Sequence, residues 1–134
     1  VVINDFEFTF KDGAVVDFKA AEGEATLQQM LDSDPNARYL GEIALVPHHS
    51  PISDSGILFY NTLFDENASC HFALGKAYPT NVEGATELAD DELESVGLND
   101  ALIHEDFMVG APDLSIKAYK GDEVYDIFVD GNWA

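Results

Sequence analysis

The chain has 134 residues, of which 26 are acidic and 6 are lysine or arginine, so its formal net charge at pH 7 is −20. This length corresponds to one domain, and a hydrophobic share of 46% is enough for a core, so the acidity does not indicate disorder. The charge excludes a sequence-independent grip on nucleic acid or on an anionic membrane surface, because both need many basic side chains. It is compatible with metal cations, with basic peptides, or with solubility alone.

The cysteine count and the chain ends set the expected cellular context. A single cysteine, Cys70, excludes an internal disulfide. No apolar run approaches the ~20 residues of a membrane span, and no signal-peptide pattern opens the chain, so we expect a cytoplasmic setting without membrane contact. The chain starts at Val1, and its only methionines are Met30 and Met108. We therefore expect a processed protein or a piece of a longer one.

The first part of the chain predicts a hairpin, a helix and a strand. Phe6, Phe8 and Phe10 alternate with polar residues, as in a half-buried strand, and Asp12-Gly13 is a tight-turn signal. Apolar residues spaced three and four apart indicate a helix that ends before Pro35. The predicted elements are strands over residues 6–10, 14–18 and 39–46, a helix over residues 22–31, and a loop over residues 47–55.

The second part predicts further short strands and one more helix. The helix has an acidic first turn, which suits the positive end of its dipole, and Gly97 ends it. The predicted elements are a short apolar run over residues 57–60, a bend over 65–67, strands over 69–74 and 102–109, the helix over 90–96, and a hairpin of 114–119 with 124–129 around residues 120–122. The sequence thus predicts one α+β domain over residues 1–134, rich in strands, with hairpins and two short helices.

The clearest chemical signal is the strand over residues 102–109, LIHEDFMV. Residues two apart in a strand point to the same side, so His104 and Asp106 project together, about 7 Å apart along the strand. An imidazole and a carboxylate so placed suit one metal ion or two neighbouring ions. The alternative is an exposed strand face that is polar without a chemical role.

Glu42 and His71 add to this signal. Glu42 interrupts an apolar strand, where a buried carboxylate is costly unless a cation meets it, and the chain offers only six basic side chains. His71 also lies in an apolar strand, where a hydrogen-bonded structural histidine is the alternative to a ligand. With His104 and Asp106 they form a nitrogen and oxygen donor set that suits zinc, cobalt or manganese.

Cys70 and Tyr78 are weaker candidates. Cys70 cannot form a thiolate–imidazole couple with His71, because neighbours in a strand point to opposite faces, and it is interpreted as a small core residue. Tyr78 follows the His71 strand closely, so its hydroxyl could donate a hydrogen bond to a developing oxyanion. The alternative for Tyr78 is ordinary packing.

Two polar segments remain open. His48 and His49 lie on a loop, where they could bind a metal or a substrate or simply be solvated. Asp65 and Glu66 either contact the metal ligands without binding the metal themselves or only form a turn.

Longer motifs resemble a known family. They are YLGEIALVP around Glu42, SPIS at residues 50–53, GILFYNTLFDENASCH at 56–71, ALGKAYP at 73–79, NDALIHEDFMVG at 99–110 and the terminal DGNWA. In this order they resemble the thermophilic-type metallo-aminopeptidases, the aminopeptidase T and aminopeptidase S group. The resemblance runs from about residue 8 to residue 134 and implies a hydrolase that releases amino-terminal residues from peptides.

The resemblance also implies a metal site. The family binds two divalent metal ions, usually zinc or cobalt, with two glutamates, two histidines and an aspartate. By motif, Glu42 is the second glutamate and bridges the two ions, His71 is the first histidine, and His104 with Asp106 completes the set. Tyr78 matches the tyrosine that assists catalysis.

One ligand is missing from this comparison. The family's first glutamate lies upstream of the first hairpin, and its members are about three times longer. The chain therefore resembles a carboxy-terminal part with four of five ligands, partial or no metal occupancy and little activity alone.

Other functions remain as alternatives. The resemblance implies a homodimer, so a non-catalytic dimerisation or interaction module is the second hypothesis. An unrelated acidic calcium-binding domain is the third, but calcium prefers six to eight oxygen ligands, and two histidines argue against it.

Overall fold

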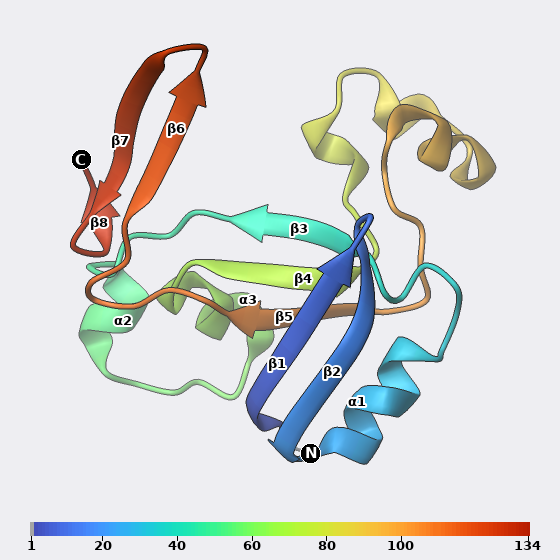
Figure 1. Ribbon diagram of the computed structural model, residues 1–134, viewed down its shortest axis with the longest axis horizontal. Coiled ribbons are helices and arrows are strands. Elements are labelled where there is room, and N and C mark those ends of the chain that lie inside the picture. Colours follow the sequence, from blue (N-terminus) through green and yellow to red (C-terminus); the bar gives the residue numbers. More distant parts are fainter. Residues whose placement is uncertain (1) are drawn as a thin grey trace. The chain divides into compact units, whose positions relative to one another are not determined.

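The structure is a computed structural model that describes residues 2–134. Its strands form three small sheets, with the orders β1-β2, β3-β4-β5 and β6-β7-β8 (Figure 1). This arrangement of separate sheets and short helices confirms the predicted α+β class. The strands are β1 (Asn4–Lys11), β2 (Ala14–Glu22), β3 (Leu40–Ala44), β4 (His71–Gly75), β5 (His104–Met108), β6 (Ile116–Lys120), β7 (Glu123–Val129) and β8 (Asn132–Trp133).

Helical segments are short and lie between the strands. The α-helices are α1 (Glu24–Leu31), α2 (Pro51–Ser55) and α3 (Thr62–Asp65), and the 3-10 helices are η1 (Glu66–Ala68), η2 (Pro79–Asn81), η3 (Ala85–Glu87) and η4 (Asp90–Val96). Within residues 2–134, none of these helices has the length and apolar character needed to cross a membrane.

The chain divides into two compact units. The first comprises Val1–Glu42 and Ala73–Glu105, and the second comprises Ile43–Phe72 and Asp106–Ala134.

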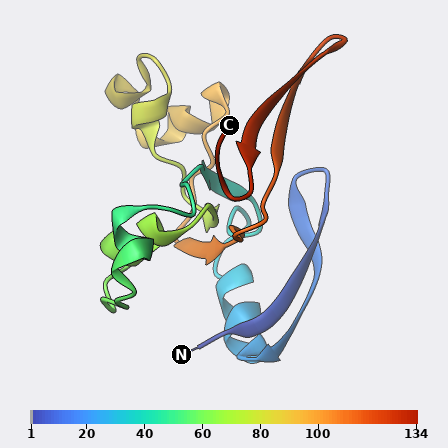
Figure 2. The same cartoon turned by 90° about the vertical axis from the view of Figure 1, so that its left-hand side faces the viewer.

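The first unit begins with the predicted hairpin. Strands β1 and β2 pair antiparallel with Phe8 opposite Phe18, and the turn residues Asp12 and Gly13 have φ angles of 52° and 85°. Positive φ at both positions matches the right-handed twist of a hairpin. Helix α1 follows β2 directly (Figure 2). It starts two residues later than predicted, because Gly23 takes a left-handed conformation and Glu22 stays in β2.

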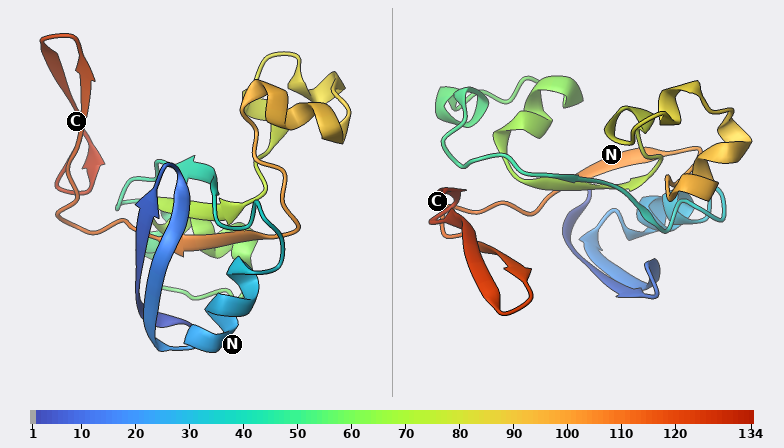
Figure 3. Two further views of the ribbon diagram at one scale, coloured as in Figure 1. Left: turned by 45° about the vertical axis from the view of Figure 1, so that its right-hand side comes forward. Right: turned by 90° about the horizontal axis from the view of Figure 1, so that it is seen from above.

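The second half of the first unit is a group of 3-10 turns, which Figure 3 shows gathered together. Their core consists of Ala77, Ala85, Leu93 and Leu98, with Val82 and Leu88 packed against it. The helix predicted over residues 90–96 has the right bounds and ends at Gly97, which has a φ of 86°. It is a 3-10 helix.

The second unit corrects two predictions. Residues 47–55 were predicted as a loop, but α2 occupies Pro51–Ser55. Ser50 caps this helix by accepting from the Ser53 N–H, Pro51 is its first residue, and Gly56 ends it in a left-handed conformation. Capping residues stabilise such a short helix, and it has no apolar periodicity from which it could be predicted. The predicted bend over residues 65–67 is likewise helical, at the junction of α3 and η1.

The carboxy-terminal sheet of the second unit confirms the second hairpin. Strands β6 and β7 pair antiparallel with Lys120 opposite Glu123, so the turn is Gly121-Asp122, one residue shorter than predicted. The short strand β8, absent from the sequence prediction, pairs Trp133 with Phe128. The rings of Phe128 and Trp133 meet edge to face, 4.5 Å apart, and Phe128 is fully buried.

Candidate metal centre

In the first unit the structure brings together two of the predicted ligands. Glu42 lies on β3 and His104 on β5, and the Oε2 atom of Glu42 is 3.3 Å from the Nε2 atom of His104. Both side chains are largely shielded from solvent, with exposed fractions of 27% and 19%. The strand positions of both residues agree with the sequence prediction.

The other ring nitrogen fixes the chemistry of His104. Its Nδ1 atom lies 2.6 Å from the Lys76 carbonyl oxygen. A carbonyl only accepts, so Nδ1 is the donor, and the neutral ring carries its lone pair on Nε2, facing the Glu42 carboxylate. Two lone pairs at this distance require a proton or a cation between them. A proton on Nε2 makes this an ion pair, and with a neutral ring the two residues can contribute to a cation site.

Tyr78 lies against this pair. Its ring centroid is 4.9 Å from that of His104, and its side chain is 53% exposed. Pro79 follows Tyr78 and begins η2, so the chain turns directly after the tyrosine. The phenol is therefore both close to a candidate ligand and open to solvent.

The second unit contains a further group of possible ligands. One ligand atom from each of Glu66, His71 and Asp106 lies within 4.8 Å of the others. His71 opens β4 and is only 3% exposed, whereas Glu66 and Asp106 are half-buried. On β5 the exposed Glu105 separates the half-buried His104 and Asp106, which is the alternation that the sequence predicts for a strand.

His71 is oriented in the same manner as His104. Its Nδ1 atom is 2.9 Å from the Ser69 carbonyl oxygen, so Nδ1 donates and the neutral ring carries its lone pair on Nε2. A main-chain carbonyl bound to one ring nitrogen is typical of metal-ligating histidines. The sequence does not reveal this arrangement, because the carbonyls of Ser69 and Lys76 carry no side-chain signal.

Glu66 is the candidate ligand that sequence reasoning left aside. The sequence suggests a turn residue or a residue that supports the ligands, whereas its carboxylate lies in the group with His71 and Asp106. Glu66 precedes His71 by five residues, and η1 with residues 69 and 70 folds between them. A 3-10 helix of three residues has no clear sequence pattern, so the sequence does not predict that Glu66 lies near His71.

Most lysine and arginine side chains form ion pairs with carboxylates outside these groups. Lys76 bonds Asp100 at 2.7 Å, and this hydrogen bond raises the pKa of the Lys76 ammonium. Lys19, Arg38 and Lys117 pair with Glu7, Asp32 and Asp126. The remaining two basic residues are Lys11 and Lys120. A metal ion is therefore a more suitable partner for the grouped carboxylates than a lysine or arginine.

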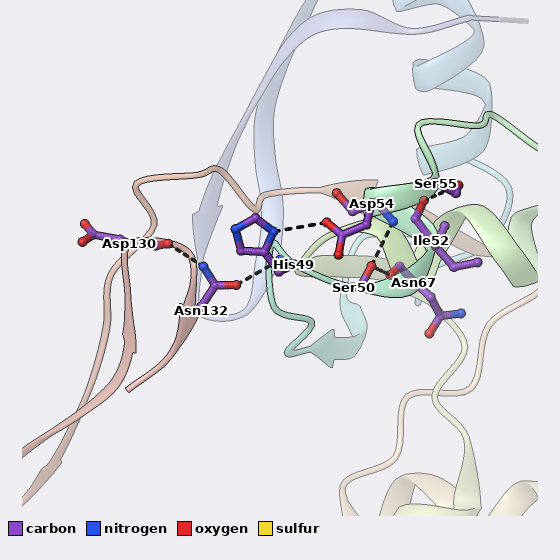
Figure 4. Close-up of polar contacts among 9 residues, drawn as sticks. His49, Ser50, Ile52, Asp54, Ser55, Asn67, Asp130 and Asn132 are labelled. Carbon is purple, nitrogen blue, oxygen red and sulfur yellow. Dashed lines mark hydrogen bonds and ion pairs between the residues drawn. The ribbon is translucent and has the colours of Figure 1, made fainter.

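Two other candidates stay outside both groups. Cys70 is buried, and its Sγ atom contacts the main chain of Val46 at 3.2 and 3.3 Å, which fits a core residue. His49 pairs with Asp54 at 3.1 Å on an exposed loop (Figure 4). Neither Cys70 nor His49 joins the ligand groups found among residues 2–134.

The donor set fits a borderline divalent metal. Imidazole nitrogen and carboxylate oxygen suit zinc and cobalt, and the Nδ1 atom of each histidine is bound to a main-chain carbonyl. A family model described as thermophilic metalloprotease (M29) matches residues 1–133. The chain belongs to this family.

Relatives of the M29 chain carry aminopeptidase names. Aminopeptidase 2 of Geobacillus stearothermophilus is 58% identical over 134 residues, which cover 99% of this chain and 32% of that protein. Aminopeptidase AmpS of Bacillus subtilis (strain 168) is 49% identical over 134 residues, which cover 99% of this chain and 33% of that protein. Aminopeptidase T of Thermus aquaticus is 42% identical over 107 residues, covering 80% of this chain and 26% of that protein.

The fold agrees with that of a solved structure. Wild-type AmpT from Thermus thermophilus superposes with a TM-score of 0.85 and 36% sequence identity, covering 98% of this chain and 32% of that one. The M29 chain therefore spans about a third of the length of the relatives that it matches.

Proposed function

We propose that this M29 chain supplies metal ligands to an aminopeptidase that hydrolyses amino-terminal residues from peptides. The observation that carries the proposal is the Glu66–His71–Asp106 group, whose ligand atoms lie within 4.8 Å of one another around a buried histidine. The aminopeptidase names of its relatives support the same activity.

Each ligand group is assigned a divalent ion in this proposal. Glu42 and His104 contribute to one, and Glu66, His71 and Asp106 contribute to the other, so the whole enzyme carries two ions, zinc or cobalt. The family resemblance adds one glutamate ligand from outside residues 1–134. Bound metal ions would polarise the scissile carbonyl and lower the pKa of a coordinated water.

The protein's own side chains complete the proposed reaction. Tyr78 donates its hydroxyl hydrogen to the oxyanion that develops on the substrate carbonyl, and its exposure leaves room for a peptide. A carboxylate beside the scissile bond moves the proton toward the leaving amine; Glu42 is the candidate among residues of the first group. We place the enzyme in the cytoplasm as a homodimer, in line with the family resemblance.

Metal titration tests the proposal directly. The 134-residue chain is stripped with a chelator and titrated with Zn²⁺ and then Co²⁺ by calorimetry. We expect binding of at least one ion, and a loss of affinity of about tenfold or more in His71→Ala. His49→Ala is the matched control, because this histidine lies on an exposed loop outside both groups. Absence of binding, or an equal loss in the control, would contradict the proposal.

Activity is expected to need more than this chain. Because the chain spans about a third of its relatives, we expect it to hydrolyse an aminoacyl-p-nitroanilide only at the background rate. Rapid hydrolysis by the purified chain would overturn that expectation while leaving the metal site in place.

A dimerisation or interaction module remains the second function. It is favoured by the exposed apolar segment that includes Ile57, Leu58, Tyr60 and Leu63, whose exposed fractions range from 59% to 90%. This alternative predicts that alanine at Glu42, His71, His104 and Asp106 leaves the oligomeric state unchanged and that no metal survives dialysis.

A further inference from the structure

The turn that leads to Glu66 is held by the carboxylate of Asp65. The Oδ1 atom of Asp65 accepts from the main-chain N–H of Phe59 at 2.9 Å, and its Oδ2 atom accepts from that of Asn61 at 3.0 Å. Both oxygens of one side chain thus bind the same turn. Hydrogen bonds to an ionised acceptor are stronger than neutral ones, so this contact fixes the turn relative to Asp65.

The turn contains a residue in an unfavourable conformation. Tyr60, between the two donors, has a φ of 55°, which bulky side chains rarely adopt. Its side chain is 90% exposed, so ring packing does not hold it there. The two hydrogen bonds from the flanking residues to Asp65 do so, aided by the stacked rings of Phe59 and Phe64, 5.4 Å apart.

The chain is also fixed on the other side of Glu66. The Asn67 side chain donates to the Leu63 carbonyl at 3.0 Å, and the buried Ser50 donates its Oγ–H to the Asn67 carbonyl at 2.7 Å (Figure 4). Asn61 caps α3 by accepting from the Leu63 N–H. Glu66 therefore lies between two residues that are each held by side-chain to main-chain hydrogen bonds.

We propose that Asp65 is a positioning residue that directs Glu66 toward His71 and Asp106. It does so by accepting hydrogen bonds from the two residues that flank Tyr60 and so fixing the turn at residues 59–61. These two hydrogen bonds fix the backbone of Asp65, the last residue of α3, and Glu66 follows it as the first residue of η1. Asp65 does not belong to the ligand group itself, because its two oxygens face the turn. The inference rests on the proposed function, in which Glu66 binds a metal ion.

Two variants of Asp65 separate positioning from folding. Asp65→Ala removes both acceptors, whereas Asp65→Asn keeps the shape and one acceptor. Zn²⁺ affinity of the 134-residue chain is measured by calorimetry, and the coordination of Co²⁺ by its visible absorption spectrum. We expect affinity to fall about tenfold or more in Asp65→Ala, less in Asp65→Asn, and the Co²⁺ spectrum to change in both.

The controls address charge and stability. Asp122→Asn removes the same charge from the exposed β6–β7 turn and is expected to leave Zn²⁺ affinity within about twofold of the unaltered chain, because salt screens distant surface charges. Urea unfolding in a chelator measures the stability of the metal-free chain. A purely structural role would lower that stability but leave the affinity and spectrum of the folded variant unchanged, and this outcome would overturn the inference.

The two proposals fail in different ways. If the unaltered chain binds neither ion, the proposed function is wrong. If it binds and Glu66→Gln has unchanged affinity and spectrum, Glu66 is not a ligand and the positioning role of Asp65 falls, while the metal site stands on the remaining residues.

Discussion

His71 and His104 show how single side chains are prepared before any ligand arrives. Each ring has Nδ1 bound to a main-chain carbonyl, that of Ser69 for His71 and that of Lys76 for His104. The backbone therefore sets the tautomer and the ring plane, and in His104 the Nε2 atom faces the Glu42 carboxylate. Because these anchors are main-chain atoms, the orientation of each histidine depends on backbone geometry at residues that have no role in chemistry.

Gly75 directly precedes Lys76, whose carbonyl binds His104, and its replacement gives a prediction at this scale. Gly75 has a φ of 95°, and a Cβ there would lie 2.1 Å from the Ile103 carbonyl oxygen. We expect Gly75→Ala to lower the free energy of unfolding by about 3 kcal/mol or more, from the backbone conformation and the clash together. Urea unfolding followed by circular dichroism measures the change.

Gly97 provides the matched control for Gly75. Its φ is 86°, but a Cβ would meet nothing within 4 Å. Gly97→Ala should cost only about 1 kcal/mol, the cost of the left-handed conformation. Equal losses in the two variants would show that the close approach to Ile103 is unimportant.

At the scale of elements, the β6-β7-β8 sheet depends on one buried ring. Phe128 on β7 is fully buried and meets Trp133 of β8 edge to face. The other large side chains of this sheet are more exposed, so Phe128 supplies most of its apolar packing.

Alanine at Phe128 tests this dependence. We expect Phe128→Ala to lower the free energy of unfolding by about 3–5 kcal/mol, measured by urea unfolding. Tyr119→Ala is the control, since Tyr119 lies on the neighbouring strand β6 with 72% exposure and should change stability by about 0.5 kcal/mol or less. A small effect at Phe128 would mean that strand pairing alone maintains the sheet.

Elements with a side-chain period were predictable, and elements made by caps were not. The alternating phenylalanines and the Asp12-Gly13 turn predict the β1-β2 hairpin. Helix α2 has only Ser50, Pro51 and Gly56 as signals, and α3 has only the Asn61 cap. Such one-turn helices bury no apolar stripe, so no periodicity marks them.

At the scale of the whole molecule, the net charge of −20 opposes compactness. Repulsion between like charges destabilises a folded chain, and salt screens it. We expect the free energy of unfolding of the metal-free chain to rise as NaCl increases from low salt to about 0.15 M, where the Debye length is near 8 Å. KCl at the same ionic strength should act equally, and a fall in stability would show that the surface ion pairs outweigh the repulsion.

The sequence alone determined the α+β class and the hairpins and predicted a nitrogen–oxygen ligand set of Glu42, His71, His104 and Asp106, because alternation and long motifs are local properties of the chain. That residues 1–134 act as one domain stays a prediction. The tertiary structure shows which of these candidate ligands lie close together: Glu42 faces His104, and His71 and Asp106 lie with Glu66. The structure also shows how few of the acidic residues could bind a cation. Most of the 26 acidic residues lie outside both groups, and folding selects the few that can meet a cation, because only a folded backbone brings distant carboxylates and imidazoles within one coordination distance.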